Sequence, residues 1–278
     1  MRIYNEFLGE VVEIPDYPER IVSLAPDITD ILHRIGVWDR VVGVSLYCKR
    51  PPAADEKPRL GAYLKVNEQK LREVKPDLIL TTTGAQRNTT LSLLKQGYPV
   101  YPIKLPFTLY DILDNISRVG AVVREIEGAY RESERLFELL KTLRKKLPPT
   151  RVMVEIDLHP EYTIGNASFL NHALDFMGLK NIFADMYASY FRTPYEIAAV
   201  RSPELIIYEP KPMRKKKPTV EELTQRYTEL GLGNAPAVKG GKILITGGDM
   251  IAHYGPAFID EVMPYITEEV ERLMDSKS

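Results

Sequence analysis

The hydrophobic positions of this chain form short apolar runs that alternate with amphipathic helical stretches. An N-terminal hairpin is predicted first, with its turn at Gly9-Glu10. Branched apolar runs bounded by turn residues suit the buried strands of a parallel sheet, and the helices between them supply the crossover connections. The predicted elements that follow the hairpin are strand 21–24, helix 29–35, strand 41–45, helix 67–74, strand 78–81, helix 89–96 and strand 100–103.

One sequence pattern occurs in both halves of the chain. Residues 75–80, KPDLIL, return as residues 201–207, RSPELII. A proline and an acidic residue ahead of branched apolar residues indicate a loop that enters a buried strand. Opening strands that begin at Arg20 and Arg151 add a second match between the halves. We therefore expect two similar lobes with a cleft between them, although α/β proteins in general repeat such units.

Between the two halves the apolar spacing becomes helical, from residue 109 to residue 147. Gly120 and a change of phase near it indicate two helices, the second predicted to span residues 122–147. At 1.5 Å per residue this helix would be roughly 39 Å long, enough to cross two small domains. A core helix of one larger domain is the alternative. The expected domains are an N-terminal lobe at residues 1–108, a helical segment with the long inter-lobe helix at 109–149, and a C-terminal lobe at 150–278.

Composition narrows the class of protein. The 278 residues are 44% hydrophobic, enough for two cores, and 37 basic against 38 acidic side chains give no electrostatic reason to expect nucleic acid. No apolar run approaches the roughly 20 residues that span a bilayer. Cys48 is the only cysteine, so no internal disulfide forms. The basic run at residues 211–218 is expected to be a solvated loop, with contact to an anionic membrane as the alternative.

The sequence lacks the common catalytic motifs: it has no GxSxG, GxxxxGK[ST], HExxH or CxxC. We therefore expect no enzyme and no catalytic cofactor. The nearest approach to a metal or acid–base cluster is Glu155, Asp157 and His159, which alternation places on one side of a strand end. Ordinary polar residues at a strand exit are the simpler interpretation of that trio.

Aromatic and amphipathic side chains gather in loops that follow predicted strands. Flat rings with a polar edge give large contact area at small entropic cost, which suits a large, rigid ligand. Together with nearby polar residues they form the expected ligand-binding set: Asp27, Tyr47, Tyr63, Gln86, Arg87, Tyr162, Phe169, Tyr190, Phe191, Met250, His253 and Tyr254.

The segments RIVSLAPDITD, PDLIL and GNASFLN carry a family resemblance. With their surroundings they resemble the helical-backbone substrate-binding proteins of ABC importers, which serve cobalamin, ferric siderophores and haem. The matching segments are residues 20–52, 57–81, 162–185, 202–207 and 235–258. The resemblance implies two Rossmann-like α/β lobes with parallel sheets, joined by a single long α-helix, with the ligand held in the cleft between the lobes.

Cobalamin-binding members are the most similar part of this family. Tyr47 and Tyr63 match two of their aromatic positions, and the third falls at Thr82. The implied function is capture of a cobalamin or another corrinoid and its delivery to the permease of an ABC importer. A ferric siderophore or haem is the alternative ligand.

The resemblance also implies how such a protein meets its permease, through one acidic residue on each lobe. Glu196 matches in the second lobe; in the first lobe the matching position is Gln69, with Glu68 beside it. We expect a monomer outside the cytoplasm. Because the N-terminal sequence MRIYNEFLGE lacks the pattern of a secretory signal, a cytosolic corrinoid carrier, metal-handling protein or enzyme with the same fold is the alternative.

Overall fold

The computed structural model describes residues 1–158, 160–211 and 216–275. His159 of the metal candidate and residues 212–215 of the basic run lie outside the described residues. Within the described part, no helix is both long enough and apolar enough to cross a membrane. The chain divides into two compact units: the first comprises residues 1–106, 110–138 and 254–257, and the second comprises residues 107–109, 139–253 and 258–278.

The first unit contains an antiparallel hairpin and a four-stranded parallel sheet, both as predicted. The hairpin pairs β1 (Arg2–Asn5) with β2 (Glu10–Glu13). Nearly every residue of the sheet is buried, which explains why its strands are mainly apolar, with Ser23, Thr81 and Thr82 as small polar residues at strand ends. The sheet has the order β4-β3-β5-β6 and comprises β3 (Ile21–Ser23), β4 (Val41–Val44), β5 (Leu78–Thr82) and β6 (Val100–Ile103).

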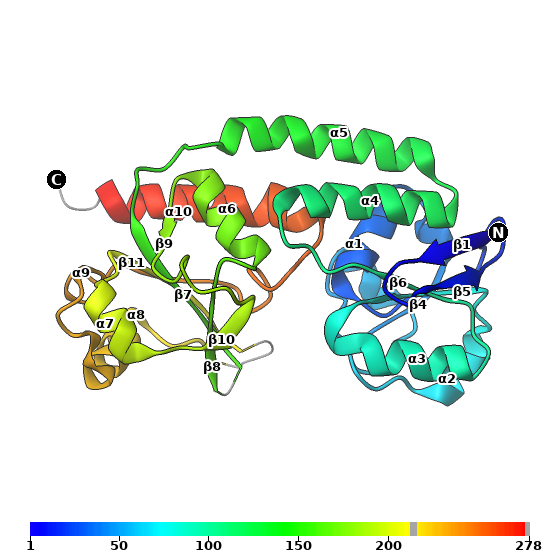
Figure 1. Cartoon of the computed structure of the whole chain (residues 1–278), viewed down its shortest axis with the longest axis horizontal. Helices are drawn as coiled ribbons and strands as arrows, with labels where there is room; N and C mark the ends of the chain where they lie inside the picture. Colours follow the sequence, from blue (N-terminus) through cyan, green and yellow to red (C-terminus); the bar gives the residue numbers. More distant parts are fainter. Residues whose placement is uncertain (159, 212–215, 276–278) are drawn as a thin grey trace. The chain divides into compact units, whose positions relative to one another are not determined.

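The helices of the first unit connect these strands and cover both faces of the sheet, with α2 and α3 on one side and α1 and α4 on the other (Figure 1). Helix α1 starts earlier than predicted because Pro26 occupies its first turn, where proline is well tolerated. The helical segments are α1 (Pro26–Arg34), η1 (Trp38–Arg40), η2 (Pro52–Glu56), α2 (Glu68–Val74), η3 (Gly84–Gln86) and α3 (Arg87–Lys95).

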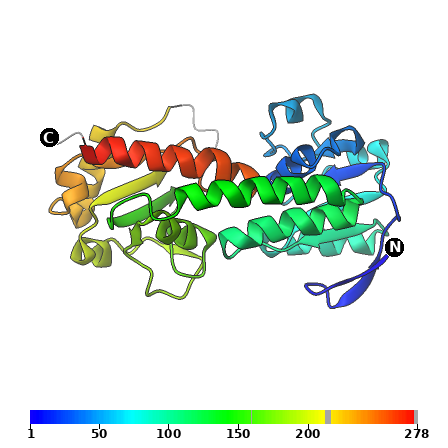
Figure 2. The same ribbon diagram turned by 90° about the horizontal axis from the view of Figure 1, so that it is seen from above.

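Two longer helices follow, α4 (Leu109–Val123) and α5 (Ile126–Leu143), which lie side by side (Figure 2). The predicted bounds of the second helix, 122–147, are wrong. Arg124 at φ 58° and Lys145 at φ 52° adopt left-handed backbone conformations that end helical geometry on both sides. With 18 residues, α5 is about 27 Å long. The division between the units falls within α5, after Glu138.

The second unit contains a six-stranded sheet in the order β10-β8-β7-β11-β12, with β9 also paired to β7. Strands β7, β9, β11 and β12 are parallel, as predicted, but β8 is antiparallel to both β7 and β10. Only three residues separate β7 from β8, too few for a parallel crossover, so the two strands form a hairpin. The strands are β7 (Arg151–Asp157), β8 (Glu161–Ile164), β9 (Lys180–Asn181), β10 (Tyr190–Arg192), β11 (Leu205–Glu209) and β12 (Ile243–Ile245).

The helices of the second unit surround a core in which Met153, Ile206 and Tyr227 are fully buried. Helix α8 begins with a capping box in which the Thr219 hydroxyl accepts from the backbone N–H of Glu222, whose carboxylate accepts from the N–H of Thr219. The helical segments are α6 (Phe169–Met177), α7 (Tyr195–Arg201), α8 (Val220–Tyr227), η4 (Thr228–Leu232), α9 (Pro236–Lys239), η5 (Phe258–Val262) and α10 (Met263–Asp275).

The sequence repeat corresponds to a repeated set of hydrogen bonds, which we call the Arg–acid clasp. In the first unit the carboxylate of Asp77 accepts from the backbone N–H of Arg20 at 2.9 Å. The guanidinium of Arg20 donates to the carbonyl of Val74 at 2.7 Å, at the end of α2. In this way the clasp fastens the end of α2 and the start of β5 to the start of β3.

The second unit repeats the clasp with its own residues. The carboxylate of Glu204 accepts from the backbone N–H of Arg151 at 2.9 Å, and the guanidinium of Arg151 donates to the carbonyl of Ser202 at 3.2 Å. Lys75 and Ser202 end α2 and α7 in the same left-handed conformation. The two proline-acid patterns therefore have the same structural task in their separate units.

Candidate functional site

The strand order of the first unit fixes where its functional side chains gather. The chain passes from β3 outward to β4 and then returns to β5 on the other side of β3. Connections therefore leave β3 and β5 in opposite directions, and the crevice at their carboxyl ends is where α/β sheets commonly bind ligands. Asp27 follows β3, and Gln86 follows β5, at this point.

We call the crevice between the carboxyl ends of β3 and β5 the switch point of the first unit. Gln86 spans it with a buried, fully hydrogen-bonded side chain. Its carbonyl oxygen accepts from the backbone N–H of Thr82 at 2.8 Å and from the Thr82 hydroxyl at 3.1 Å. Its amide nitrogen donates to the carbonyls of Leu24 at 2.9 Å and Tyr63 at 2.8 Å. No hydrogen-bonding group of the Gln86 amide is left for a ligand, so its geometry suits holding Tyr63 in place.

Tyr63 is half-buried beside this network. Its hydroxyl lies 2.8 Å from the Thr82 hydroxyl, and because Thr82 already donates to Gln86, Tyr63 is the donor. Burial raises the pKa of Tyr63, and the nearby negative charge of Asp27 raises it further. Tyr254 also raises the pKa of Tyr63, through its charge. Tyr254 belongs to the segment 254–257, which is part of the first unit although it follows most of the second unit along the chain. The structure thus brings together Asp27, Tyr63, Gln86 and Tyr254 of the expected set.

The loop after β4 carries Tyr47, which is 43% exposed. Leu46 beside it and Leu64 beside Tyr63 are also exposed, two apolar side chains that the sequence interpretation did not include. Arg87 is exposed, and its guanidinium lies over the Phe7 ring, 5.3 Å from the ring centroid. The first unit therefore presents a mixed aromatic and aliphatic surface at the carboxyl ends of its strands.

The corresponding switch point of the second unit lies between β7 and β11. The Tyr208 hydroxyl donates across it to the Asp157 carboxylate at 3.0 Å. Glu209, the last residue of β11, is buried and accepts from the backbone N–H groups of Met250 at 2.8 Å and Ile251 at 3.1 Å. Its other oxygen accepts from the Thr246 hydroxyl. The buried carboxylate of Glu209 thus fixes the loop that carries Met250.

The remaining expected ligand residues of this unit differ in exposure. Tyr162 is half-buried on β8, and Tyr190 is 37% exposed on the neighbouring β10. The half-buried Phe191 packs edge-on against Phe183. Two others are buried: Phe169, 2% exposed and edge-on to Phe258, and His253, 5% exposed. Phe169 accordingly contributes to the core and not to an accessible surface.

Glu155 of the metal candidate is completely buried and is bound by protein side chains. Its Oε1 accepts from the Arg226 guanidinium at 2.6 Å and from the Tyr227 hydroxyl at 3.1 Å. Arg226 also donates to the Tyr195 hydroxyl at 2.7 Å. Burial raises the pKa of Glu155, and the charge of Arg226 opposes that rise. Within residues 1–158, 160–211 and 216–275, no three His, Cys, Asp or Glu side chains are grouped to hold a metal ion.

The residues expected to meet a permease lie on two short exposed helices, α2 and α7. Glu196 is exposed at the start of α7. On α2 the Gln69 amide donates to the Glu73 carboxylate at 3.1 Å, whereas Glu68 faces Arg72 at 3.6 Å. Glu73, one helical turn beyond Gln69, is therefore the acid bonded to Gln69, whereas the sequence pointed to the neighbouring Glu68.

Sequence reasoning missed the residues that organise the two switch points. Thr82, Glu209 and Arg226 did not enter the expected ligand set. One available signal was the repeat itself, because the offset that pairs Pro76 with Pro203 also pairs Thr82 with Glu209. For Arg226, 71 residues from Glu155, the sequence contains no comparable signal.

Comparison with known proteins gives the family. The family model described as periplasmic binding protein matches residues 21–250. The vitamin B12-binding protein of Vibrio cholerae is 30% identical over 192 residues, which cover 68% of this chain and 69% of the relative. The vitamin B12-binding protein of Yersinia pestis is 25% identical over 193 residues, with the same coverage.

Solved structures agree in fold. The periplasmic vitamin B12 binding protein of Vibrio cholerae has a TM-score of 0.73 at 24% identity, covering 93% of this chain and 98% of that chain. The periplasmic heme-binding protein of Roseiflexus sp. RS-1 has a TM-score of 0.79 at 19% identity, covering 92% and 98%. The names of these relatives describe binding proteins. From the family match over most of its length and the α/β fold of its two units, the chain belongs to the periplasmic binding proteins, in their helical-backbone class.

Proposed function

We propose that the protein binds a metal chelate, a cobalamin or related corrinoid first of all, and delivers it to an ABC importer. The observation that carries this proposal is the construction of the two switch points. In each unit a buried, fully engaged polar side chain, Gln86 or Glu209, holds a residue of the expected ligand set, Tyr63 or Met250. Preorganised aromatic and amphipathic groups suit a large rigid ligand, because little entropy is lost when it binds.

A corrinoid is favoured over other chelates by two lines of support. Tyr47 and Tyr63 offer flat faces at the strand ends of the first unit, with aliphatic Leu46 and Leu64 beside them. The vitamin B12-binding proteins of Vibrio cholerae and Yersinia pestis each match 68% of the chain. Heme-binding proteins share the fold, so haem is the second candidate ligand.

Titration with cyanocobalamin tests the proposal. We expect saturable binding, and we expect Tyr63→Ala to weaken it at least about tenfold, because loss of a held aromatic contact costs more than about 1.4 kcal/mol. Tyr63→Phe keeps the ring and should retain most of the affinity. Calorimetry and the visible spectrum of the corrinoid both measure the effect.

Tyr130→Ala is the matched control, since Tyr130 is 62% exposed on α5 and outside the expected ligand set. Its affinity for cyanocobalamin should equal that of the parent protein. Haemin and a ferric hydroxamate are titrated in parallel. Absence of saturation with cyanocobalamin but saturation with either chelate would move the assignment to that ligand, and absence with all three would reject the proposal.

Delivery to an importer implies an extracytoplasmic location and a docking surface on each unit. We propose Glu196 on α7 and Glu73 on α2 as its acidic groups, with Gln69 fixing the carboxylate of Glu73. Exposed Ile197 and Val200 surround Glu196 with apolar surface. Complementary charge at such a surface raises the association rate and makes it sensitive to salt.

We expect Glu196→Gln to slow association with the importer of the source organism by about tenfold at low salt. The loss should shrink at high salt, where such charges are screened. Surface plasmon resonance with the importer in nanodiscs measures the rates. Glu134→Gln on α5 is the charge-matched control and should change nothing. Equal rates for Glu196→Gln and the control would remove Glu196 from the docking surface.

A further inference from the structure

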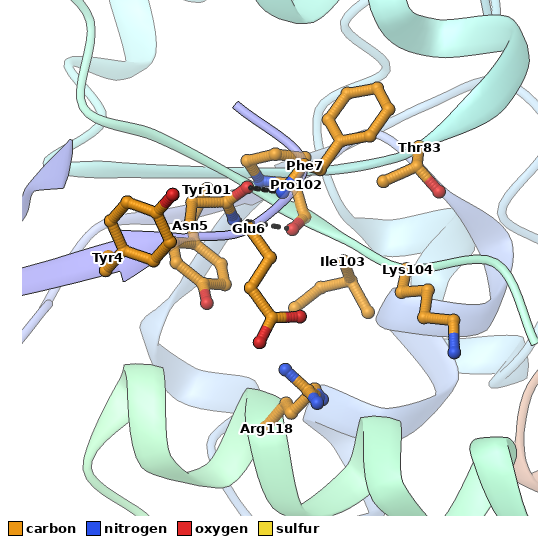
Figure 3. A pocket seen from close by; sticks show the side chains of 10 residues that line it. All are labelled: Tyr4, Asn5, Glu6, Phe7, Thr83, Tyr101, Pro102, Ile103, Lys104 and Arg118. Atoms are coloured by element: carbon orange, nitrogen blue, oxygen red, sulfur yellow. Dashed lines mark hydrogen bonds between the residues drawn. The ribbon is translucent and has the colours of Figure 1, made fainter. Parts of the chain in front are cut away.

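A cavity of about 320 Å³ lies in the first unit, lined by the turn of the N-terminal hairpin, by β6 and the residue after it, and by α4 (Figure 3). Its volume is at the lower end of the range for small-molecule sites. None of its lining residues belongs to the expected ligand set. It is too small for a corrinoid and does not belong to the site described above.

The walls of the cavity are held in place by hydrogen bonds. The Asn5 amide donates to the carbonyl of Pro102 on β6 at 3.2 Å, and its oxygen accepts from the backbone N–H of Phe7 at 3.1 Å. Asn5 is 4% exposed, so these bonds are shielded from water. The hairpin turn is therefore fixed to β6, and the aromatic rings of Tyr4, Phe7 and Tyr101 line a defined space.

Two opposite charges face one another across this space. Figure 3 shows the Glu6 carboxylate and the Arg118 guanidinium pointing toward each other, from the hairpin turn and from α4. The Arg118 Nε donates to Asp114 at 2.7 Å, on its own helix. In the described part of the chain no hydrogen bond or ion pair joins Arg118 to Glu6 directly. A ligand that carries both charges would complement the pair better than a ligand with one charge.

We propose that this cavity binds an α-amino acid with an aromatic side chain. Its ammonium group would lie at Glu6, its carboxylate at Arg118 and its side chain against the rings of Phe7 and Tyr101. Hydrogen bonds in which both partners are charged are the stronger kind, and a guanidinium can hold a carboxylate by two of them. The ring of the ligand would in turn pack on the half-buried ring of Phe7 and beside the buried ring of Tyr101.

The test uses three probes with the same phenylethyl skeleton: L-phenylalanine, 3-phenylpropanoate, which lacks the ammonium, and phenethylamine, which lacks the carboxylate. Calorimetry on the full chain, without cyanocobalamin, is expected to show saturable binding of L-phenylalanine. Each single-charge probe should bind at least about tenfold more weakly, as expected for loss of one charged hydrogen bond.

Two variants test whether Glu6 binds the ammonium group of the ligand and Arg118 its carboxylate. Glu6→Gln should weaken the binding of L-phenylalanine at least about tenfold and leave the binding of 3-phenylpropanoate unchanged. Arg118→Gln should weaken the binding of L-phenylalanine equally and leave the binding of phenethylamine unchanged. Both residues are exposed, so neither change threatens folding, and Glu134→Gln is the control. No saturation with L-phenylalanine, or undiminished binding by Glu6→Gln, overturns the proposal. Competition with cyanocobalamin would overturn the claim of a separate site, whatever the outcome of the corrinoid titration itself.

Discussion

Replacing Gln86 by Leu is expected to lower the free energy of unfolding by about 3 to 4 kcal/mol, because it orphans several buried polar groups at once. The amide of Gln86 satisfies the carbonyls of Leu24 and Tyr63 and the backbone and hydroxyl groups of Thr82. An aliphatic side chain of similar size fills the space but makes none of these bonds. Urea unfolding followed by circular dichroism measures the loss.

The same substitution separates positioning from ligand contact. Folded Gln86→Leu protein should bind cyanocobalamin at least about tenfold more weakly, because Tyr63 loses the bond that fixes its backbone. Gln86→Glu keeps the shape but replaces the donor by an acceptor, so it should also weaken binding. Gln96→Leu is the matched control, since Gln96 is exposed at the end of α3. Unchanged stability in Gln86→Leu would contradict the network as described.

Replacing Arg226 by Met is expected to lower the free energy of unfolding by about 2 to 3 kcal/mol at neutral pH. Breaking a buried ion pair from one side leaves the other charge uncompensated, which costs about 3 to 5 kcal/mol when both partners are fully buried. Glu155 is fully buried but the Arg226 side chain is 28% exposed, so the lower figure applies.

The stability that Arg226→Met loses should depend on pH in a defined direction. Burial raises the pKa of Glu155, and Arg226 opposes that rise, so in the Met variant the pKa lies higher still. A carboxyl group whose pKa is higher in the folded state binds its proton more tightly there than in the unfolded state. Its contribution to stability is therefore greatest below the unfolded pKa and is lost as the pH rises through the folded pKa. The difference between variant and parent should therefore be smaller at about pH 5 than at about pH 8.

A double variant completes the test of this ion pair. Glu155→Leu together with Arg226→Met removes both charges and should recover most of the lost stability, as replacement of buried ion pairs by apolar residues often does. Urea midpoints for the parent, both single variants and the double variant form the thermodynamic cycle. A double variant no more stable than Arg226→Met would show that packing, not charge, accounts for the loss.

The fold was predictable from the sequence because its signals are local. The runs that begin at Ile21 and Val100 are short, apolar and bounded by turn residues, and the structure has strands there. The bounds of α5 were not predictable, since Val123 and Leu147 continue the helical spacing although neither lies within it. Both side chains are buried, so their hydrophobic character reflects packing and not helix continuation.

The candidate site was predictable only in part. Aromatic residues after strands, such as Tyr47 and Tyr63, are visible in a sequence because position along the chain places them at a strand end. The residues that hold them are not, since Gln86 acts on Leu24, which is 62 residues away. Phe169 shows the reverse case: it follows a strand, but its ring turns into the core against Phe258.

The Arg–acid clasps have a consequence for how such a protein can change over evolutionary time. They join residues at the amino ends of the strands, whereas Tyr63 and Met250 belong to loops at the carboxyl ends. Substitutions, insertions and deletions in those loops therefore leave the clasps intact. Each unit keeps its own Arg–acid clasp. Changes of loop sequence can therefore alter which ligand is bound without loss of the hydrogen bonds that stabilise the fold.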